Sequence, residues 1–429
     1  MRIRRYLDLL RRNRAFTRLF AAQLISFAGD WFATVAILGL ALELTGSPTA
    51  ASLLLVVQTG AFALASPIAG VLADRFDRRL LMVIADLSRV PVALAFLLVR
   101  DPGSLWIAFV AAALLSFGAA VFEPSSSASL PNLVDDDELG EANVLIGSAW
   151  GTMLAVGAAI GGAVAATFGR DVAFAVNAAS FAASALLIVG IRRPFSRHGR
   201  EGAGQHEMPH PGLRGIAESI NVVLRFARGN RTLAALLLSK ATFGVGTGVI
   251  VMLAVFGRDV FDAGDAGIGL LFAARGLGAL IGPFLARSIV GLTERGLLMG
   301  IAGSFVTYAI GYSLLPFSPV LWVAAICVFV AHLGGGSQWM LSSYGLQRAT
   351  PDHIRGRVFS VDYGLVTVTI ALSTLVAGIL AEQLTPAATT WVMVGLAATA
   401  ASGWVMLARP IMRRTASAMP QAGDGDGAR

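Results

Sequence analysis

Ionisable side chains inside long apolar runs are the residues of this sequence that could do chemistry. Asp30 lies in the run 20–44, and Asp86 and Arg89 lie in the run 80–99. A charge deep in a membrane costs at least about 2.5 kcal/mol, so it is usually paired and often functional. At 1.5 Å per residue, Asp30 and Arg89 lie about 16 and 14 Å from the ends of their runs. We therefore expect an Asp30–Arg89 ion pair that couples to protons, with Asp86, one helical turn before Arg89, as the competing partner.

Three further ionisable residues lie near the middle of later runs, namely Lys240, Arg275 and His332. Lys240 and Arg275 have no obvious acidic partner in their half of the chain. Each is a candidate to bind an anionic substrate or to reach Asp30 from across an interface. His332 titrates near neutral pH and is a candidate proton carrier, although a hydrogen-bonded packing histidine is the alternative. We group these three residues as candidate cavity cations.

The composition shows what kind of element must position these residues. Hydrophobic residues make up 56% of the chain and charged residues 14%, and the mean hydropathy is +0.72. A soluble domain carries roughly 25% charged residues, so lipid is the expected outer solvent. The net charge of +7 does not indicate nucleic-acid binding, because the arginines lie at the ends of apolar runs.

Twelve apolar runs are long enough to cross a membrane as helices. They are 20–44, 50–73, 80–99, 105–130, 143–168, 172–191, 232–257, 267–290, 297–316, 320–343, 358–384 and 389–408. Arginines gather at one side of these spans, while the other side receives only Arg100, Arg170 and Arg258. The positive-inside rule therefore places both termini and the central loop in the cytoplasm, as expected of a multi-pass protein of the cell (inner) membrane.

The polar segment 192–231 divides the spans into two sets of six. Glycines recur at matching places in the two sets, such as Gly70 with Gly282 and Gly162 with Gly378. This repetition predicts an all-α integral membrane protein of two six-helix bundles related by pseudo-two-fold symmetry. We expect bundles over 1–191 and 232–414, a cytoplasmic linker over 192–231 whose part 213–228 is an amphipathic helix, and a disordered cytoplasmic tail over 415–429.

The loop after the second run carries a recognisable motif. It reads Gly70-Val-Leu-Ala-Asp74-Arg75-Phe-Asp77-Arg78-Arg79. This resembles the G-x-x-x-D-R-x-G-R-R signature of the major facilitator superfamily, with Asp77 in place of a glycine. The resemblance implies a cytoplasmic gate in which Asp74 faces a helix N-terminus, the eleventh span being the expected one, and the arginines bind carboxylates or lipid phosphate. The gate residues expected are Gly70, Asp74, Arg75, Arg78 and Arg79, with Gly356 and Arg357 before the eleventh span.

Other stretches are similar to a narrower branch of this superfamily, the siderophore- and macrolide-efflux-like exporters, or transmembrane secretion effectors. They include Ser26–Trp31, Glu123-Pro124 and Arg355–Val358. In the fifth span, Gly157, Gly161 and Gly162 resemble the G-P-x-x-G-G core of antiporters, with Ala158 in place of the proline. That departure leaves a plain glycine packing face as an equal alternative.

A substrate cavity between the bundles is the expected site of binding. Aromatic and amide side chains on the spans that would line it suit amphipathic organic ligands. The candidates are Phe27, Trp31, Gln58, Trp150, Phe243, Gln338 and Trp339. Asp362 and Glu123 are placed near the cytoplasmic ends of their spans, as gate or capping residues.

The sequence favours proton-coupled export of an amphipathic drug, siderophore or secondary metabolite by alternating access. It has no G-x-x-x-x-G-K-[ST] loop for nucleotides, so no cofactor is expected and a proton gradient is the implied energy source. The alternatives are a substrate–proton symporter for import, or a non-transporting membrane sensor or enzyme. The five histidines form no cluster suited to catalysis or a metal, so no enzyme activity is expected. The expected partners are a small-molecule substrate and membrane lipid but no nucleic acid, with the chain a monomer.

Overall fold

The chain is described by a computed structural model that covers residues 2–135, 137–193, 195, 213–291 and 293–417. Every regular element in these ranges is a helix. The side chains of Gly70 and Asp74 lie outside the described set, as do the residues 418–429 of the expected tail and most of the polar segment 192–212.

The first half of the chain forms a bundle of six long helices, which we call the N-bundle. Its helices end at short polar turns or at glycines in the left-handed region, as at Gly46. Its elements are α2 (Arg14–Thr45), α3 (Pro48–Arg75), α4 (Arg78–Ala95) with η1 (Phe96–Leu98), η2 (Pro102–Ser104) with α5 (Leu105–Leu133), α6 (Leu139–Phe168) and α7 (Arg170–Val189).

The second half forms the C-bundle, whose first span is interrupted. The expected seventh span consists of two α-helices and a π-helical turn, with the break at Thr247-Gly248. The elements are α9 (Arg231–Gly246), α10 (Val249–Val255) and η3 (Phe256–Val260), then α11 (Gly264–Ile289), α12 (Glu294–Leu314) with η4 (Leu315–Phe317), α13 (Leu321–Ala349), α14 (Asp352–Ala381) and α15 (Pro386–Ser417).

Twelve helical segments of the described chain are long and apolar enough to span a membrane. Large apolar side chains project from their outer faces, where Leu64 is 79% exposed and Ile289 is 79% exposed. In a helix bundle of a membrane protein such residues face lipid, which is as apolar as they are. The expected fold class, an all-helical integral membrane protein of twelve spans, is confirmed.

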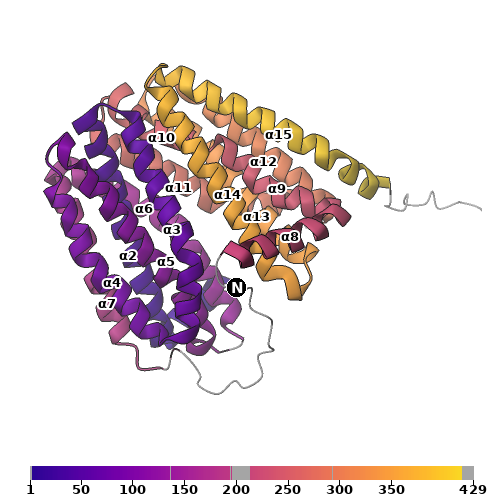
Figure 1. Ribbon diagram of the computed structural model, residues 1–429, viewed down its shortest axis with the longest axis horizontal. Coiled ribbons are helices and arrows are strands. Elements are labelled where there is room, and N and C mark those ends of the chain that lie inside the picture. The colour runs from indigo at the N-terminus through magenta and orange to yellow at the C-terminus, as the bar shows by residue number, and fades with distance from the viewer. Residues whose placement is uncertain (1, 136, 194, 196–212, 292, 418–429) are drawn as a thin grey trace, which may run out of the picture.

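The two bundles are inclined to one another and meet at the end of the molecule that carries α10 (Figure 1). One buried apolar cluster crosses between them there, and it joins Val35 and Leu154 of the N-bundle to Val249 and Phe272 of the C-bundle. We call this the gate end. The opposite end, where α7 ends and α8 lies, we call the linker end.

Two helices outside the spans lie at the linker end. The first, α1 (Arg2–Arg12), is strongly basic and precedes Asn13, whose side chain caps α2 by accepting a hydrogen bond from the Phe16 amide. The second, α8 (Leu213–Gly229), is the amphipathic helix that the sequence predicts. It packs against α9 and α14, with Val223 buried among apolar residues of the C-bundle. The side of α8 that carries Val223 therefore contacts protein, while Ile220 and Leu224 are 40% and 46% exposed.

Candidate functional site

Arg89 of α4 lies at the centre of the charged site in the N-bundle. The guanidinium makes its short ion pair with Asp86, one turn earlier, and a longer one of 3.9 Å with Asp30 of α2. The Arg89 side chain is 2% exposed and Asp86 is fully buried, whereas the Asp30 side chain is 31% exposed. Phe181 and Phe122 stack on the guanidinium at 4.2 and 5.5 Å. Arg89 is therefore paired mainly with Asp86, and Asp30 has the most exposed side chain of these three residues.

Glu123 of α5 belongs to the same charged group. It is half-buried within its span, and its charge interacts with those of Asp30 and Arg89. The expectation of a capping residue at a helix end was wrong, because α5 continues to Leu133 through Pro124 and Pro131. Glu123 lies in the last third of the apolar run 105–130, and for that reason the sequence alone placed it near the end of its span.

The second buried ion pair lies in the C-bundle, between Lys240 of α9 and Asp362 of α14. The Lys240 Nζ is 2.5 Å from the Asp362 Oδ2, and the two side chains are 1% and 0% exposed. The ammonium also lies 4.9 Å from the ring of Trp339. Two expectations are corrected: Lys240 has an acidic partner in its own half, and Asp362 is a buried pairing residue, not a gate.

His332 is also buried and is not a free cation of a cavity. Its Nε2 lies 2.8 Å from the Tyr312 hydroxyl, and the rings of Tyr308 and Tyr312 pack on it at 5.8 Å. With an exposure of 4%, His332 is a hydrogen-bonded packing residue between α12 and α13. The backbone of α11 at Gly278 comes so close that an added Cβ would lie 2.9 Å from the His332 Cβ.

Arg275 of α11 differs from the other charges within the spans. It is half-buried, its Nε–H is buried without a hydrogen-bond acceptor, and no carboxylate of the described chain lies within ion-pair distance. The guanidinium lies 5.7 Å from the ring of Phe272, one turn earlier. Arg275 is thus a cation at mid-span with no counter-charge among the described residues.

Aromatic side chains from both bundles meet beside these charges. Trp31, which follows Asp30 in α2, packs on Trp150 of α6 at 6.2 Å and on Phe272 of α11 at 6.0 Å. Trp150 is 45% exposed, and Phe27 and Gln58 are half-buried. These residues include ring faces and an amide that an amphipathic ligand could contact.

Of the three expected cavity residues on the C-bundle, Gln338 is buried in the interior, whereas Phe243 and Trp339 are half-buried. Gln338 is fully buried within hydrogen-bond distance of Ser239, so its assignment to a cavity was wrong. Phe243 packs edge-on against Tyr308 at 4.7 Å. Trp339 is half-buried between Lys240 and Tyr363, whose ring it contacts at 5.8 Å. The position of a residue within an apolar run predicts its depth in the membrane. It does not predict whether its side of the helix faces the cavity or the interior of the bundle.

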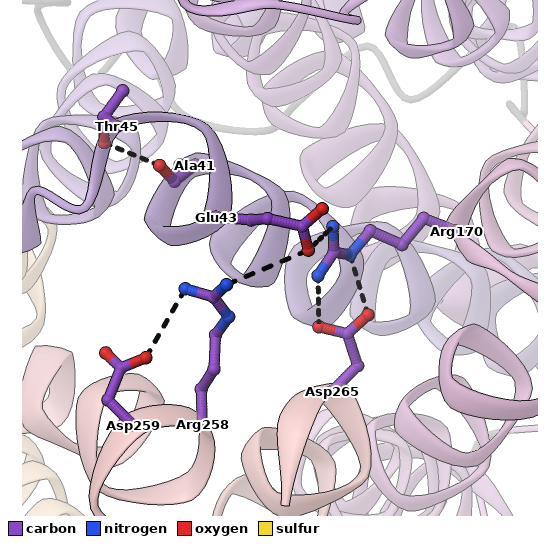
Figure 2. Close-up of polar contacts among 7 residues, drawn as sticks. All are labelled: Ala41, Glu43, Thr45, Arg170, Arg258, Asp259 and Asp265. Carbon is purple, nitrogen blue, oxygen red and sulfur yellow. Dashed lines mark hydrogen bonds and ion pairs between the residues drawn. The ribbon is translucent and has the colours of Figure 1, made fainter. Parts of the chain in front are cut away.

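A network of charges joins the bundles at the gate end (Figure 2). Arg170, at the start of α7, binds Asp265 of α11 through two hydrogen bonds of 2.7 and 3.1 Å and binds Glu43 of α2 at 2.8 Å. Glu43 also lies 3.8 Å from Arg258 of η3, which in turn pairs with Asp259 at 3.4 Å. The Arg170 and Arg258 contacts thus cross between the bundles in both directions. From the sequence, Arg170 and Arg258 were noted only as two of the three arginines on the arginine-poor side of the spans.

A second polar contact joins the bundles at the same end. Glu382, at the end of α14, accepts hydrogen bonds from the Ser47 hydroxyl and, at 3.2 Å, from the Thr49 amide. These groups form the N-terminus of α3, where free N–H groups favour a carboxylate. Next to them Gly378 touches α3, because an added Cβ would lie 2.1 Å from the Ser52 hydroxyl. The C-bundle therefore helps to cap a helix of the N-bundle.

The glycines of α6 are packing positions on two neighbouring helices. An added Cβ would lie 3.2 Å from the Ala28 backbone at Gly157 and 2.7 Å from the Phe32 Cα at Gly161, both in α2. At Gly162 it would lie 2.6 Å from the Asp265 carbonyl oxygen, in α11 of the other bundle. The α6–α11 contact is therefore backbone against backbone, and it brings Asp265 to the Arg170 network.

The signature loop between α3 and α4 makes contacts within the N-bundle. Arg78 donates to the carbonyl oxygens of Ala73 and Ala128 at 3.1 and 2.6 Å, and Arg79 donates to that of Val189. These acceptors are carbonyl oxygens and not the expected carboxylates, and the alternative partner, lipid phosphate, stays a prediction. Asp77 caps α4 through the Leu80 amide at 2.8 Å. Arg75 and Gly356 are exposed and Arg357 is half-buried. The gate roles expected of Gly70 and Asp74 stay predictions, because these two residues lie outside the set whose side chains are described.

Twelve spans in two bundles, charges buried in each bundle and ionic contacts that join them at one end define a membrane transporter. A family model described as "Transmembrane secretion effector" matches residues 10–422. The chain belongs to this family of the major facilitator superfamily. The expected resemblance is confirmed, and the family is one of transporters, not enzymes.

Relatives and solved structures agree with this assignment. The chain is 29% identical over 386 residues to the multidrug efflux pump Tap of Mycobacterium tuberculosis, covering 86% of this chain and 88% of that protein. It is 29% identical over 186 residues to the uncharacterized MFS-type transporter YfiS of Bacillus subtilis, a match that spans 43% of this chain and less than half, 44%, of that relative.

The fold is shared with solved transporters. A bacterial homologue of the human lysosomal transporter Spinster, in an inward-facing and unoccupied conformation, superposes with a TM-score of 0.71 at 15% identity, covering 94% of this chain and 98% of that one. The nucleoside transporter NupG superposes with a TM-score of 0.70 at 14% identity, covering 92% and 99%.

Proposed function

We propose that this secondary transporter exports an amphipathic organic compound in exchange for protons by alternating access. The observation that carries the proposal is the state of Asp30. It is a carboxylate at mid-span, part-exposed, and only loosely paired with an arginine that Asp86 already holds. An acid in that position gains or loses a proton when its distance to the cation changes.

The charge distribution along the chain assigns the two ends of the transporter to the two sides of the membrane. The arginine-rich ends of the spans lie at the linker end, and the positive-inside rule assigns that end to the cytoplasm. The gate end then faces the outside, and the contacts of Arg170, Arg258 and Glu382 close the outer side of the transporter. The relative Tap, an efflux pump by name, favours the same direction.

The geometry of the Arg89 group supports the following proton step. In the outward-open state Arg89 lies closer to Asp30 and keeps it ionised. A proton from outside then neutralises Asp30, which loosens the pair and favours closure of the gate end. In the closed state described here the Arg89–Asp30 distance is already 3.9 Å, longer than a close ion pair. On the cytoplasmic side Asp30 releases its proton as substrate is loaded.

Transport into inverted membrane vesicles tests this function. With an acidic interior, wild-type vesicles should accumulate at least one of a panel of anionic, neutral and cationic amphipathic fluorophores. Asp30→Asn, which imitates the protonated acid, should lose uphill accumulation and keep downhill exchange. Glu218→Gln, an exposed acid of α8, is the matched control and should transport as wild type.

Two outcomes would contradict the proposal. Uphill accumulation by Asp30→Asn at the wild-type rate would remove Asp30 from coupling. Proton-driven accumulation in right-side-out vesicles alone would identify an importer.

A further inference from the structure

Arg275 lies on α11 where this helix packs against α6 of the N-bundle. The next residue, Gly276, faces α6 so closely that an added Cβ would lie 2.4 Å from the Ala155 nitrogen. Two turns toward the gate end, Gly269 approaches the Ala158 carbonyl oxygen, where the corresponding distance is 2.5 Å. The α11 backbone is therefore fixed against the N-bundle on both sides of Arg275, and the guanidinium projects from a rigid position.

The lack of a counter-charge sets Arg275 apart. The other two cations buried at mid-span, Arg89 and Lys240, each hold an aspartate. Arg275 holds none among the described residues, and its Nε–H is buried without an acceptor. An unpaired guanidinium within a membrane costs several kcal/mol, so a protein that keeps one normally uses it. A guanidinium presents a planar fork of donors that matches a carboxylate.

The surroundings of Arg275 suit a ligand that is anionic at one end and apolar at the other. Phe272 underlies the guanidinium, and its ring joins those of Trp31 and then Trp150. The part-exposed Trp150 ends this row of rings on the N-bundle. Tyr312 also interacts electrostatically with Arg275, and its hydroxyl lies within hydrogen-bond distance of His332.

We propose that Arg275 binds the carboxylate of the transported compound while Trp31 and Trp150 contact its apolar part. The inference rests on the proposed transport function and names its substrate class, amphipathic organic anions. The ligand would touch both bundles at once, because Trp31 belongs to α2 and Arg275 to α11.

Equilibrium binding of a matched pair of radiolabelled probes tests the proposal. 2-Naphthylacetate carries a carboxylate, and 2-naphthylacetamide is its neutral counterpart of nearly equal shape. Purified full-length protein without any gradient should bind the acid at least about tenfold more tightly than the amide, since a hydrogen-bonded charge contributes roughly that much. Arg275→Gln should reduce this ratio to about one, and Arg275→Lys, which lacks the fork, should give an intermediate ratio.

The ratio of the two affinities within one variant does not depend on the fraction of protein that is folded. Arg287→Gln, an exposed arginine of the same helix, is the control and should keep the wild-type ratio. A wild type without preference for the acid, including one that binds neither probe, overturns the proposal. So does an Arg275→Gln variant that keeps the preference. The binding test uses no proton gradient, so its result does not depend on whether Asp30 couples export to protons. A failure of one test therefore does not imply a failure of the other.

Discussion

Lys240 is the only lysine of the chain, and its ammonium group lies against Asp362 and the rings of Trp339 and Phe359. One carboxylate oxygen of Asp362 accepts a hydrogen bond from the ammonium, while the other is buried without a hydrogen-bond partner in the described chain. Neither charge reaches water or lipid headgroups. The pair therefore fixes α9 to α14 inside the C-bundle, and its two members depend on each other.

Removal of one member of this pair should destabilise the protein more than removal of both. Lys240→Met or Asp362→Leu leaves an uncompensated buried charge, for which we expect a loss of about 3–5 kcal/mol. The double variant replaces the pair by apolar groups and should recover most of that loss. Thermal unfolding of the purified protein in detergent measures the effect, and single variants as stable as wild type would contradict it.

The same residues show how far a sequence can define a site. Asp86 and Arg89 are one turn apart, so their contact follows from helix geometry alone. Asp30 and Arg89 were matched by depth. Lys240 and Asp362 lie far apart in the chain, and only the packing of α9 against α14 brings them together. Burial of His332 and Gln338 depends on helix rotation, which a Gly-rich span of nearly uniform polarity does not specify.

At the scale of elements, the end of α14 in the C-bundle helps to cap the start of α3 in the N-bundle. Ser47 caps α3 by accepting from the Ala50 amide, and Glu382 supplies a second acceptor from the other bundle. The hydrogen bond from Ser47 lowers the pKa of Glu382 in this closed state. Because opening would break that bond, the closed gate end favours the ionised form of Glu382.

The sign of the resulting pH dependence is fixed by the lowered pKa. The stabilisation is fully present above the ordinary glutamate pKa, roughly 4.3, and is lost as pH falls through the lowered value. We therefore expect a gate end that stays closed from about pH 8 to pH 6 and opens more often below about pH 4. Spin labels at Asp101 and Gln383, one on each bundle, should report a wider distance distribution at the low pH.

The control for this experiment is Glu382→Gln, which removes the titrating group and keeps an amide of similar size. It should be more open than wild type at neutral pH, and its distribution should change less between neutral and acidic pH. Equal acid responses in the two proteins would assign the opening to other groups of the gate end.

For the whole molecule, the sequence was sufficient to predict the number of spans and the two-bundle arrangement, because lipid imposes a length on every helix and leaves few alternatives. It did not predict the break of the seventh span at Thr247-Gly248 or the π-helical turn at 256–260. Hydropathy is unaffected by a break inside an apolar run. The sequence also did not predict the inter-bundle contacts at the gate end, because these contacts join residues from opposite halves of the chain.

The orientation of the whole molecule gives a direct prediction. Cysteines introduced at Gly103, between α4 and α5, and at Gly204, in the central linker, should face opposite sides of the membrane. An impermeant maleimide applied to intact cells should label G103C, and should label G204C only after permeabilisation. The single native cysteine, Cys327, is buried and gives little background. Labelling of both positions in intact cells would contradict the arrangement.

Opposite charges held within one bundle also determine how the transporter responds to the membrane potential. The Lys240–Asp362 pair is neutral and moves as a unit, so its displacement does no electrical work. Arg275 carries a charge without a counter-charge among the described residues, and work of up to about 2.3 kcal/mol per 100 mV applies to a charge that crosses the whole field. A carboxylate bound to Arg275 would cancel that charge. The empty carrier would then be voltage-sensitive at this position, and the loaded carrier would be much less so.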